Sequence, residues 1–183
     1  MRIVGGRHRG RAIVAPPGRK IRPTADRVRE SVFNILSHGL GADAPRLDGM
    51  RVLDAFAGTG AMGLEALSRG AGHATFMDLD VAPCRANIEA LGETARCEVV
   101  RADCLRPPPA PAQATLLFID PPYGDKRAQA ALMALDHAGW IATGAICIVE
   151  TGAGEEIAPT PEFAQLDDRR YGAARIRFLR RER

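Results

Sequence analysis

The stretch Asp120-Pro121-Pro122-Tyr123 follows an apolar run at residues 116–119 and offers groups that could orient a nucleobase amine. Its two prolines stiffen the chain and remove two N–H donors, so the loop is rich in hydrogen-bond acceptors. An amino group could donate to the Asp120 carboxylate and the Pro121 carbonyl while its ring stacks on Tyr123. These contacts would aim the nitrogen at a methyl donor and stabilise the amine as it becomes positive. The base would have to be unpaired or flipped to enter.

A glycine-rich turn, Gly58-Thr59-Gly60, stands between a predicted buried strand at residues 52–56 and a helix that starts at residue 61. Glycine tolerates positive φ and lets a ligand approach bare main chain, and the first-turn N–H groups of the helix point at whatever is bound. Asp54 adds a carboxylate beside the turn. The stretch is therefore a candidate cradle for a nucleotide-type cofactor.

Gly58, Gly60 and Gly63 also match the spacing of a dinucleotide-binding fingerprint, and Asp78 lies near the offset of a ribose-binding acid. Asp54 would repel the pyrophosphate of NAD, whereas it would attract a cofactor with a cationic amino-acid end. The pattern therefore favours S-adenosylmethionine, which would leave as S-adenosylhomocysteine.

Aspartates lie at or just past the ends of four successive predicted strands. Ligands of open α/β sheets bind beyond the carboxyl ends of the strands, near the point where the strand order reverses. We therefore expect Asp78 to accept the ribose hydroxyls and Asp103 the adenine amino group. The full predicted cofactor set is Asp54, Ala55, Phe56, Gly58, Thr59, Gly60, Asp78, Leu79, Asp103 and Cys104.

The elements that must hold these residues follow from the alternation of apolar and amphipathic stretches. Strands are expected at 52–56, 74–77, 97–100, 115–119 and 145–149, and helices at 61–69, 81–91 and 126–136. Such alternation, with near-continuous apolar strands, indicates an α/β fold with a doubly wound, mostly parallel sheet.

The C-terminal part reads as an antiparallel hairpin, residues 165–168 and 174–179, at one edge of that sheet. Ile176 and Phe178 alternate with Arg175 and Arg177 there. Since successive side chains of a strand point to opposite faces, the two arginines should face solvent or phosphate.

At the N-terminus, Arg2–Val4 and Ala12–Ala15 flank a Gly/Arg segment and predict a hairpin with a basic tip. An amphipathic helix should follow, with Thr24 as its N-cap, Gly39 beyond its end, and an apolar stripe at Val28, Val32, Ile35 and Leu36. We expect residues 1–40 to form this extension, packed on a body at residues 41–183.

Both ends of the chain are basic. Residues 1–29 hold nine Arg and Lys against one Asp, and residues 169–183 hold seven Arg against one Glu, while the part between them is acidic. Such segregation is expected when a catalytic body grips a polyanion through flanking segments. The residues predicted to contact RNA are Arg7, His8, Arg9, Arg11, Arg22, Arg175 and Arg177.

Composition excludes several classes of protein. No apolar run approaches the roughly 18 residues of a membrane span, and the N-terminus has no signal-peptide core. Four cysteines without a C-x-x-C pair, and four scattered histidines, favour reduced structural thiols over disulfides or a zinc site. We expect a cytoplasmic, monomeric protein with no metal and no membrane partner.

Asp120-Pro-Pro-Tyr123 resembles the fourth motif of class I amino-methyltransferases, and residues 53–60 resemble their first. Over nearly its whole length the chain is similar to the RsmD-type family of bacterial small-subunit rRNA guanine-N2-methyltransferases. The other stretches that carry this resemblance are residues 2–6, 9–11, 22–24, 29–36, 63–71 and 171–172.

The resemblance implies a Rossmann-like, seven-stranded fold, S-adenosylmethionine as donor, and small-subunit (16S) rRNA in an assembled or partly assembled subunit as acceptor. It implies that Asp54, Gly58 and Gly60 hold the methionine end and that residues 120–123 hold the target guanine. One departure is Asp78, where the family usually has Glu, so the shorter side chain must lie closer to the ribose or act through water.

Three alternatives remain open at this point. A DNA adenine-N6 methyltransferase uses the same loop chemistry but would need target recognition from the basic ends alone. An NAD(P)-dependent oxidoreductase would need a substrate domain and an acid or base for hydride transfer. A non-catalytic RNA-binding assembly factor would retain the cofactor pocket without turnover.

Overall fold

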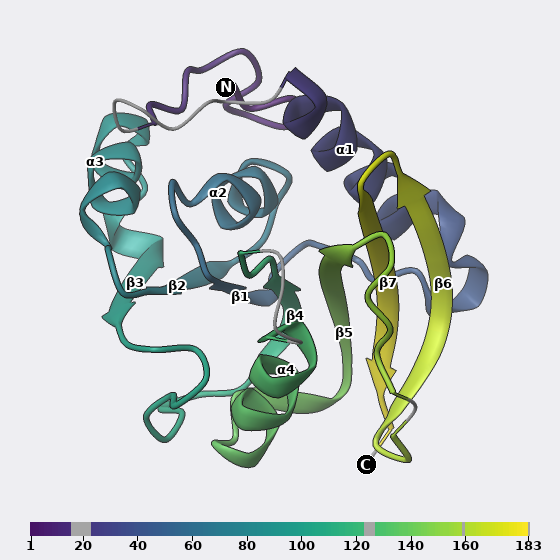
Figure 1. Ribbon diagram of the computed structural model, residues 1–183. Coiled ribbons are helices and arrows are strands. Elements are labelled where there is room, and N and C mark those ends of the chain that lie inside the picture. The colour runs from purple at the N-terminus through teal and green to yellow at the C-terminus, as the bar shows by residue number, and fades with distance from the viewer. Residues whose placement is uncertain (16–22, 123–126, 159, 183) are drawn as a thin grey trace.

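The computed structural model describes residues 1–15, 23–122, 127–158 and 160–182, and its centre is a seven-stranded sheet (Figure 1). The strands are β1 (Arg51–Ala55), β2 (His73–Asp78), β3 (Cys97–Arg101), β4 (Ala114–Ile119), β5 (Ile141–Gly152), β6 (Phe163–Tyr171) and β7 (Ala174–Arg181). Their order is β3-β2-β1-β4-β5-β7-β6; the first five run parallel, and β7 runs antiparallel to both β5 and β6. The predicted doubly wound sheet with an edge hairpin is confirmed.

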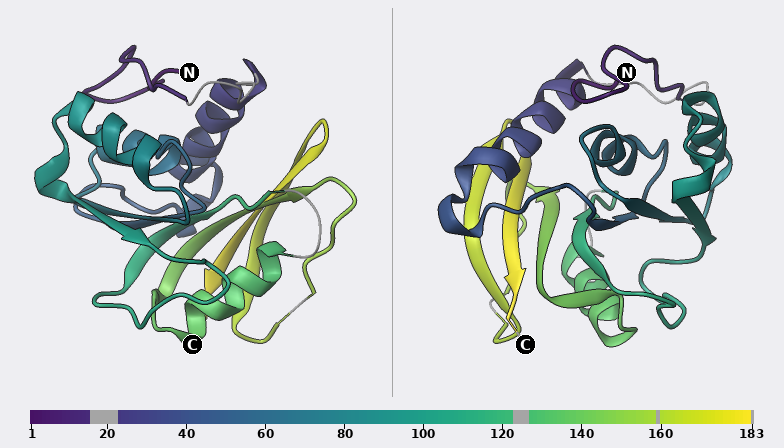
Figure 2. Two further views of the ribbon diagram at one scale, coloured as in Figure 1. Left: turned by 60° about the vertical axis from the view of Figure 1, so that its left-hand side comes forward. Right: turned by 180° about the vertical axis from the view of Figure 1, so that it is seen from behind.

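Helices cover both faces of the sheet. They are α1 (Pro23–Asn34), which continues as the π-turn η1 (Ile35–Gly39), α2 (Ala61–Ser68), α3 (Ala82–Leu91) and α4 (Arg127–His137), with short 3₁₀ turns η2 (Gly41–Asp43) and η3 (Thr94–Arg96). α1, α2 and α3 lie on one face and α4 on the other (Figures 1 and 2). None of the helices in the described residues is both long and apolar enough to cross a bilayer.

Alternation along the central strands divides the core into two halves. Val52 of β1 and Phe118 of β4 pack on the side of α1, α2 and α3. Leu53 and Leu117 pack on the side of α4. Because β1 and β4 are covered on both faces, nearly every residue in them is buried, as their continuous apolar sequences predict.

The helix α1 differs from its prediction at both ends. It begins at Pro23, so Thr24 lies inside the helix and its prediction as N-cap is wrong. Proline suits a first helical turn because that turn has no internal partner for its N–H groups. Gly39, predicted beyond the end, is the last residue of the π-turn. The apolar stripe is confirmed, since Val32 and Leu36 are buried in the core.

The predicted N-terminal hairpin is also confirmed. Arg2 and Ala12 form an antiparallel bridge, and the Ile3 and Ile13 amides donate to the carbonyls of Arg11 and Met1 at 2.9 Å each. Ile3 and Ile13 are buried. The hairpin lies over α2, between α3 and α1 (Figures 1 and 2), so it is part of the packed body.

Candidate active site

A cleft of about 1000 Å³ opens at the carboxyl ends of β1, β2, β4 and β5. Eleven of the residues predicted for the cofactor and the target base line it: Asp54, Phe56, Gly58, Thr59, Asp78, Leu79, Asp103, Cys104, Asp120, Pro121 and Pro122. Ala55 and Gly60 are buried beside it in the strand and the turn. Tyr123 lies outside the described residues. The chain thus brings both predicted groups of residues to one cleft.

The glycine turn is held in a conformation that most side chains avoid. Gly58 and Gly60 have φ of 54° and 78°, and Phe56, which is not a glycine, has φ of 60°. A non-glycine residue in this region costs on the order of 1–3 kcal/mol. Two hydrogen bonds hold Phe56 in this conformation. The Phe56 amide donates to Cys104 Sγ at 3.3 Å, and the Ala57 amide donates to the Met77 carbonyl at 3.1 Å.

The third glycine of the fingerprint serves packing. A Cβ added to Gly63 would lie 2.4 Å from Cε1 of Phe76, and one added to Gly60 would lie 2.8 Å from Cys84 Sγ. Both neighbours are buried. Gly63 therefore lets α2 approach β2 closely and Gly60 lets the turn approach α3, which positions the first turn of α2 at the cleft.

Two aspartates already accept the backbone donors at this helix end. Asp54 accepts the N–H of Gly63 in the first turn of α2 at 2.8 Å, and Asp78 accepts the N–H of Gly58 in the glycine turn at 2.8 Å. A phosphate at a helix N-terminus depends on such donors being available. Their use by two carboxylates disfavours a pyrophosphate at this spot and favours a ligand with a positive charge.

Burial makes Asp54 an unusually weak acid. The side chain is almost completely enclosed, and burial, with a smaller contribution from the nearby Asp78 carboxylate, raises the pKa of Asp54 from 3.8 to about 7; the Gly63 N–H opposes this shift. The folded protein therefore keeps a proton that the unfolded chain releases. The protonated form of Asp54 favours the folded state. Its contribution to the free energy of unfolding is complete below pH 4 and is lost as the pH rises to about 7.

We expect Asp54→Asn to remove this pH dependence. The amide oxygen still accepts the Gly63 N–H, but no carboxylate has to be buried. Unfolding by denaturant should show nearly equal stability of the two proteins at pH 3 and an advantage of Asp54→Asn at pH 8 that reaches about 4 kcal/mol. Asp48→Asn, at an exposed aspartate, is the matched control. Parallel stability curves for wild type and Asp54→Asn would contradict the assigned acidity.

The adenine side of the predicted site lies in the loop after β3. The Asp103 carboxylate accepts the Leu105 N–H at 2.9 Å, which fixes the loop and leaves Asp103 on the cleft wall. Burial raises the pKa of the neighbouring Cys104 thiol to about 12, so it stays protonated. All four cysteines are free. Among the described residues, no group of three or more His, Cys, Asp and Glu side chains could hold a metal ion.

Asp120 is the first residue after β4 and is exposed at the cleft, while Pro121 is buried beneath it. A carboxylate and a proline carbonyl at this place can accept both hydrogens of a planar amine. The loop therefore has, in its described part, the acceptors that its sequence predicts.

Most of the residues predicted to contact RNA are instead used within the protein. Arg7 and His8 both pair with the buried carboxylate of Glu93. Arg11 donates to the Ala90 carbonyl at 2.7 Å. These contacts fasten the hairpin tip to the end of α3, because a buried carboxylate needs charged partners.

The prediction that Arg177 faces solvent or phosphate is wrong, because both faces of β7 are covered. Arg177 is only 2% exposed, donates to Thr151 Oγ1 at 3.0 Å, and pairs with Glu156. Arg175 is likewise held by Asp168, at 2.7 Å, and by Glu156.

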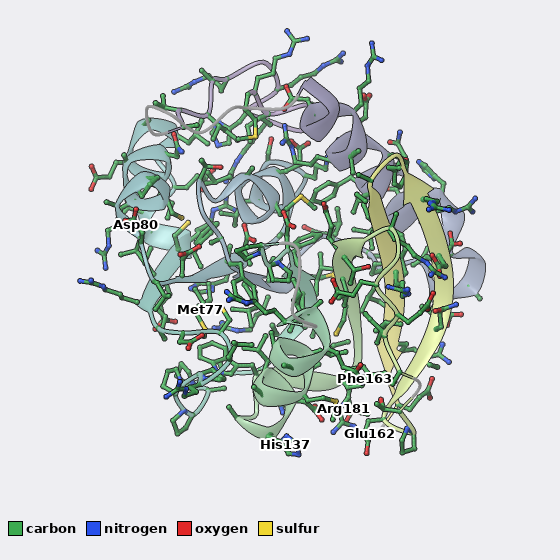
Figure 3. The ribbon with its side chains drawn as sticks, in the orientation of Figure 1. Met77, Asp80, His137, Glu162, Phe163 and Arg181 are labelled. Carbon is green, nitrogen blue, oxygen red and sulfur yellow. The ribbon has the colours of Figure 1, made fainter. Side chains whose placement is uncertain are left out.

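Of the remaining predicted RNA contacts, Arg22 lies outside the described residues. Arg9 is exposed, and its side chain forms no ion pair with the described part of the chain. Further along, Arg181 lies beside Phe163 at the end of the molecule away from the N-terminal hairpin (Figure 3) and donates to Asp136 at 2.6 Å. The usable cations are therefore fewer than the sequence count indicates.

Several residues that line the cleft were missed by the sequence analysis, notably Glu150, Arg29 and Tyr171. Glu150 could have been found by applying the strand-end rule to β5 as well as to the first four strands. Arg29 and Tyr171 come from elements outside the parallel sheet, so only the packing of α1 and the β6–β7 turn reveals them.

Comparison with known proteins gives consistent matches over most of the chain. The family model described as "Conserved hypothetical protein 95" matches residues 1–180. The chain is similar to the "Ribosomal RNA small subunit methyltransferase D" of Escherichia coli (strain K12), with 35% identity over 166 residues, 88% of this chain and 79% of that protein. The Haemophilus influenzae protein of the same name is 30% identical over 185 residues, 97% and 92% of the two chains. The solved structure of yhhF from Escherichia coli has 31% identity and a TM-score of 0.81, and the match covers 100% of this chain and 98% of that one.

Proposed function

Given that the chain belongs to the family described as "Conserved hypothetical protein 95", we propose that it transfers a methyl group from S-adenosylmethionine to the exocyclic N2 amine of a guanine in small-subunit (16S) rRNA. Its sheet has the class I methyltransferase fold. The small-subunit rRNA methyltransferase names of its relatives support the acceptor class. The substrate is an assembled or partly assembled subunit.

The observation that carries this proposal is the shared cleft. The carboxylate-lined glycine turn and the Asp120 loop open into the same space, so a donor and an acceptor amine can meet there. Asp54 and Asp78 have taken up two of the N–H groups that a pyrophosphate could use, those of Gly63 and Gly58, which supports a cationic cofactor over NAD.

When bound, S-adenosylmethionine supplies an electrophilic methyl group on its sulfonium. Asp54 would face its ammonium group, Asp78 its ribose hydroxyls and Asp103 its adenine amine. The Asp120 carboxylate and the Pro121 carbonyl accept the two N–H bonds of the guanine amine, which aims the nitrogen lone pair at the methyl group. The Asp120 charge then stabilises the nitrogen as it becomes positive, and the methylated amine loses one proton, to Asp120 or to solvent, which leaves neutral N2-methylguanine and S-adenosylhomocysteine.

Phosphate contacts would come from exposed arginines of the N-terminal hairpin, α1 and β6. Arg9 is in the hairpin, Arg27 precedes Val28 of the cleft wall, and Arg170 precedes Tyr171. None of the three forms an ion pair with the described residues. Phosphate contacts position RNA without reading sequence, so selectivity would come from the shape of the subunit, and protein-free rRNA would be a poor substrate.

We expect Arg9→Glu and Arg27→Glu each to weaken binding to the small subunit and to reduce the slope of log K against log salt by about 1, because each removes one phosphate contact. Filter binding over a series of salt concentrations measures this slope. Arg51→Glu, at an exposed arginine where β1 begins, on the opposite edge from the cleft, is the matched control and should leave the slope unchanged. A wild-type slope in Arg9→Glu and in Arg27→Glu would remove these two residues from the RNA surface.

The acceptor class is tested by supplying labelled S-adenosylmethionine with three acceptors: small subunits that lack the modification, protein-free rRNA and duplex DNA. The proposal predicts transfer to subunits well above transfer to free rRNA, and none to DNA. Transfer to DNA would support an adenine methyltransferase instead. Tight cofactor binding without transfer to any acceptor would support a non-catalytic role.

A further inference from the structure

The cleft continues past the predicted cofactor residues into a second compartment between the sheet and α1. Phe118 of β4, Ile148 of β5 and Ile176 of β7 form its floor, and Val28 and Val32 of α1 also line it. Binding pockets commonly have volumes of roughly 300–1,000 Å³. At about 1000 Å³, the whole cleft has room for a second ligand beside a cofactor.

The end of β6 and the turn that follows it close one side of this compartment. Tyr171 lines the cleft, and its hydroxyl is 2.6 Å from Oγ of Ser31 in α1. This hydrogen bond joins the end of β6 to α1. A mostly apolar space with a fixed aromatic wall suits a planar base that has left its stack.

Glu150 adds a carboxylate to this compartment, directly beside Asp120. In the parallel pairing of β4 with β5, Phe118 is opposite Ile148 and Ile119 is opposite Val149. Asp120 is the first residue after β4 and Glu150 is the next residue of β5, and neighbouring strands lie about 4.8 Å apart. Glu150 also pairs with Ile176 of β7, so its backbone belongs to a rigid part of the sheet.

The side chain of Glu150 shares the face of Ile148, because residues two apart in a strand point the same way. Both line the cleft. A ligand that reaches the Asp120 loop from this compartment therefore meets two acceptors close together, Asp120 just past β4 and Glu150 on β5.

Guanine matches two adjacent acceptors, because its N1–H and its N2 amine are neighbouring donors on one edge. Adenine has an unprotonated N1, an acceptor, in the corresponding position. We propose that Glu150 accepts the N1–H of the target base while Asp120 and Pro121 accept the N2 amine, which makes Glu150 the residue that selects guanine over adenine. This inference rests on the proposed function.

A carboxylate rejects adenine for a physical reason. The Glu150 carboxylate would face the lone pair of adenine N1. The carboxylate and N1 are both acceptors, so each would lose its contact with water without gaining a hydrogen bond. Sites built around such a bond discriminate strongly against a ligand that lacks the donor.

The first test compares Glu150→Ala with wild type, using small subunits that lack the modification. We expect kcat/KM to fall roughly 10²-fold, the effect of losing a hydrogen bond to a charged group. The dissociation constant of S-adenosylmethionine and the melting temperature should not change. Glu89→Ala, at an exposed glutamate of α3, is the matched control and should behave as wild type.

The second test replaces the target guanine by a base whose N1 is a hydrogen-bond acceptor and not a donor. After the methylated position is mapped, subunits are assembled with 2,6-diaminopurine there, which keeps the N2 amine but has no hydrogen on N1. Wild type should prefer guanine by roughly 10²-fold. Glu150→Gln has an amide that can accept or donate, so its preference should shrink to within about 10-fold.

Three results would overturn the inference: wild-type kcat/KM in Glu150→Ala, a parallel loss of cofactor affinity or of melting temperature in that variant, or an unchanged preference in Glu150→Gln. The proposed function fails separately. If wild type produces no N2-methylguanosine, the reaction itself is wrong; if wild type produces it and Glu150→Ala does so equally well, only the role of Glu150 is wrong.

Discussion

Asp120→Ala is expected to lower methyl transfer roughly 10³-fold while the affinity for S-adenosylmethionine changes by less than about 3-fold. The carboxylate lies at the end of β4 on the acceptor side of the cleft, where it accepts the amine and stabilises the positive charge that develops on nitrogen. Asp54 and Asp78, which would hold the cofactor, keep their contacts with the glycine turn and α2 in this variant. Single-turnover kinetics and calorimetry measure the two quantities.

Asp120→Asn separates the effect of the charge from that of the acceptor oxygen, and Asp48→Ala is the control. The asparagine keeps an acceptor oxygen but loses the charge, so its rate should lie between those of wild type and the alanine variant. Asp48 is exposed and does not line the cleft, so Asp48→Ala should have the wild-type rate. Wild-type turnover in Asp120→Ala would exclude the carboxylate from the reaction.

Glu65→Ala is expected to lower the free energy of unfolding by about 3–5 kcal/mol, because removal of one partner leaves buried charges uncompensated. The Glu65 carboxylate is fully buried and accepts the Val4 amide at 2.9 Å, Arg29 Nε at 3.3 Å and Arg69 Nε at 2.7 Å. It therefore ties the N-terminal hairpin and α1 to α2. Denaturant unfolding gives the free energy.

Hydrogen exchange shows where this stability is lost. The amides of Ile3, Gly10 and Ile13 bond across the hairpin, and they should exchange faster in Glu65→Ala than the amides of the central strands. Glu89→Ala, on the surface of α3, should change stability by less than about 0.5 kcal/mol. A loss below about 1 kcal/mol in Glu65→Ala would mean that apolar packing alone holds the hairpin.

The sheet could be predicted because its strands are buried on both faces and read as continuous apolar runs separated by amphipathic helices. The strand ends were harder to predict. β5 extends over residues 141–152, beyond the predicted 145–149, because Ile141 pairs with Ala114 of β4 at its start and pairing with β7 continues the strand to Gly152. The π-turn after α1 could not be predicted, because the apolar stripe continues through it with helical spacing.

The cofactor side of the site was also accessible from sequence, since glycines and strand-end acids are local signals. The roles of the basic residues were not. Glu93 lies 85 residues from His8 along the chain, and the partners of Arg177 come from a loop that returns over β7, so their pairing depends on packing that no local pattern encodes. Charge counts overstate an RNA surface for this reason.

The identity of the methylated nucleoside tests the central claim most directly. Wild-type protein is incubated with labelled S-adenosylmethionine and small ribosomal subunits that lack the modification, the rRNA is digested, and the labelled nucleoside is identified by mass spectrometry. N2-methylguanosine from a single position is the predicted result. Label in N6-methyladenosine, or no label despite tight cofactor binding, would contradict the proposed function.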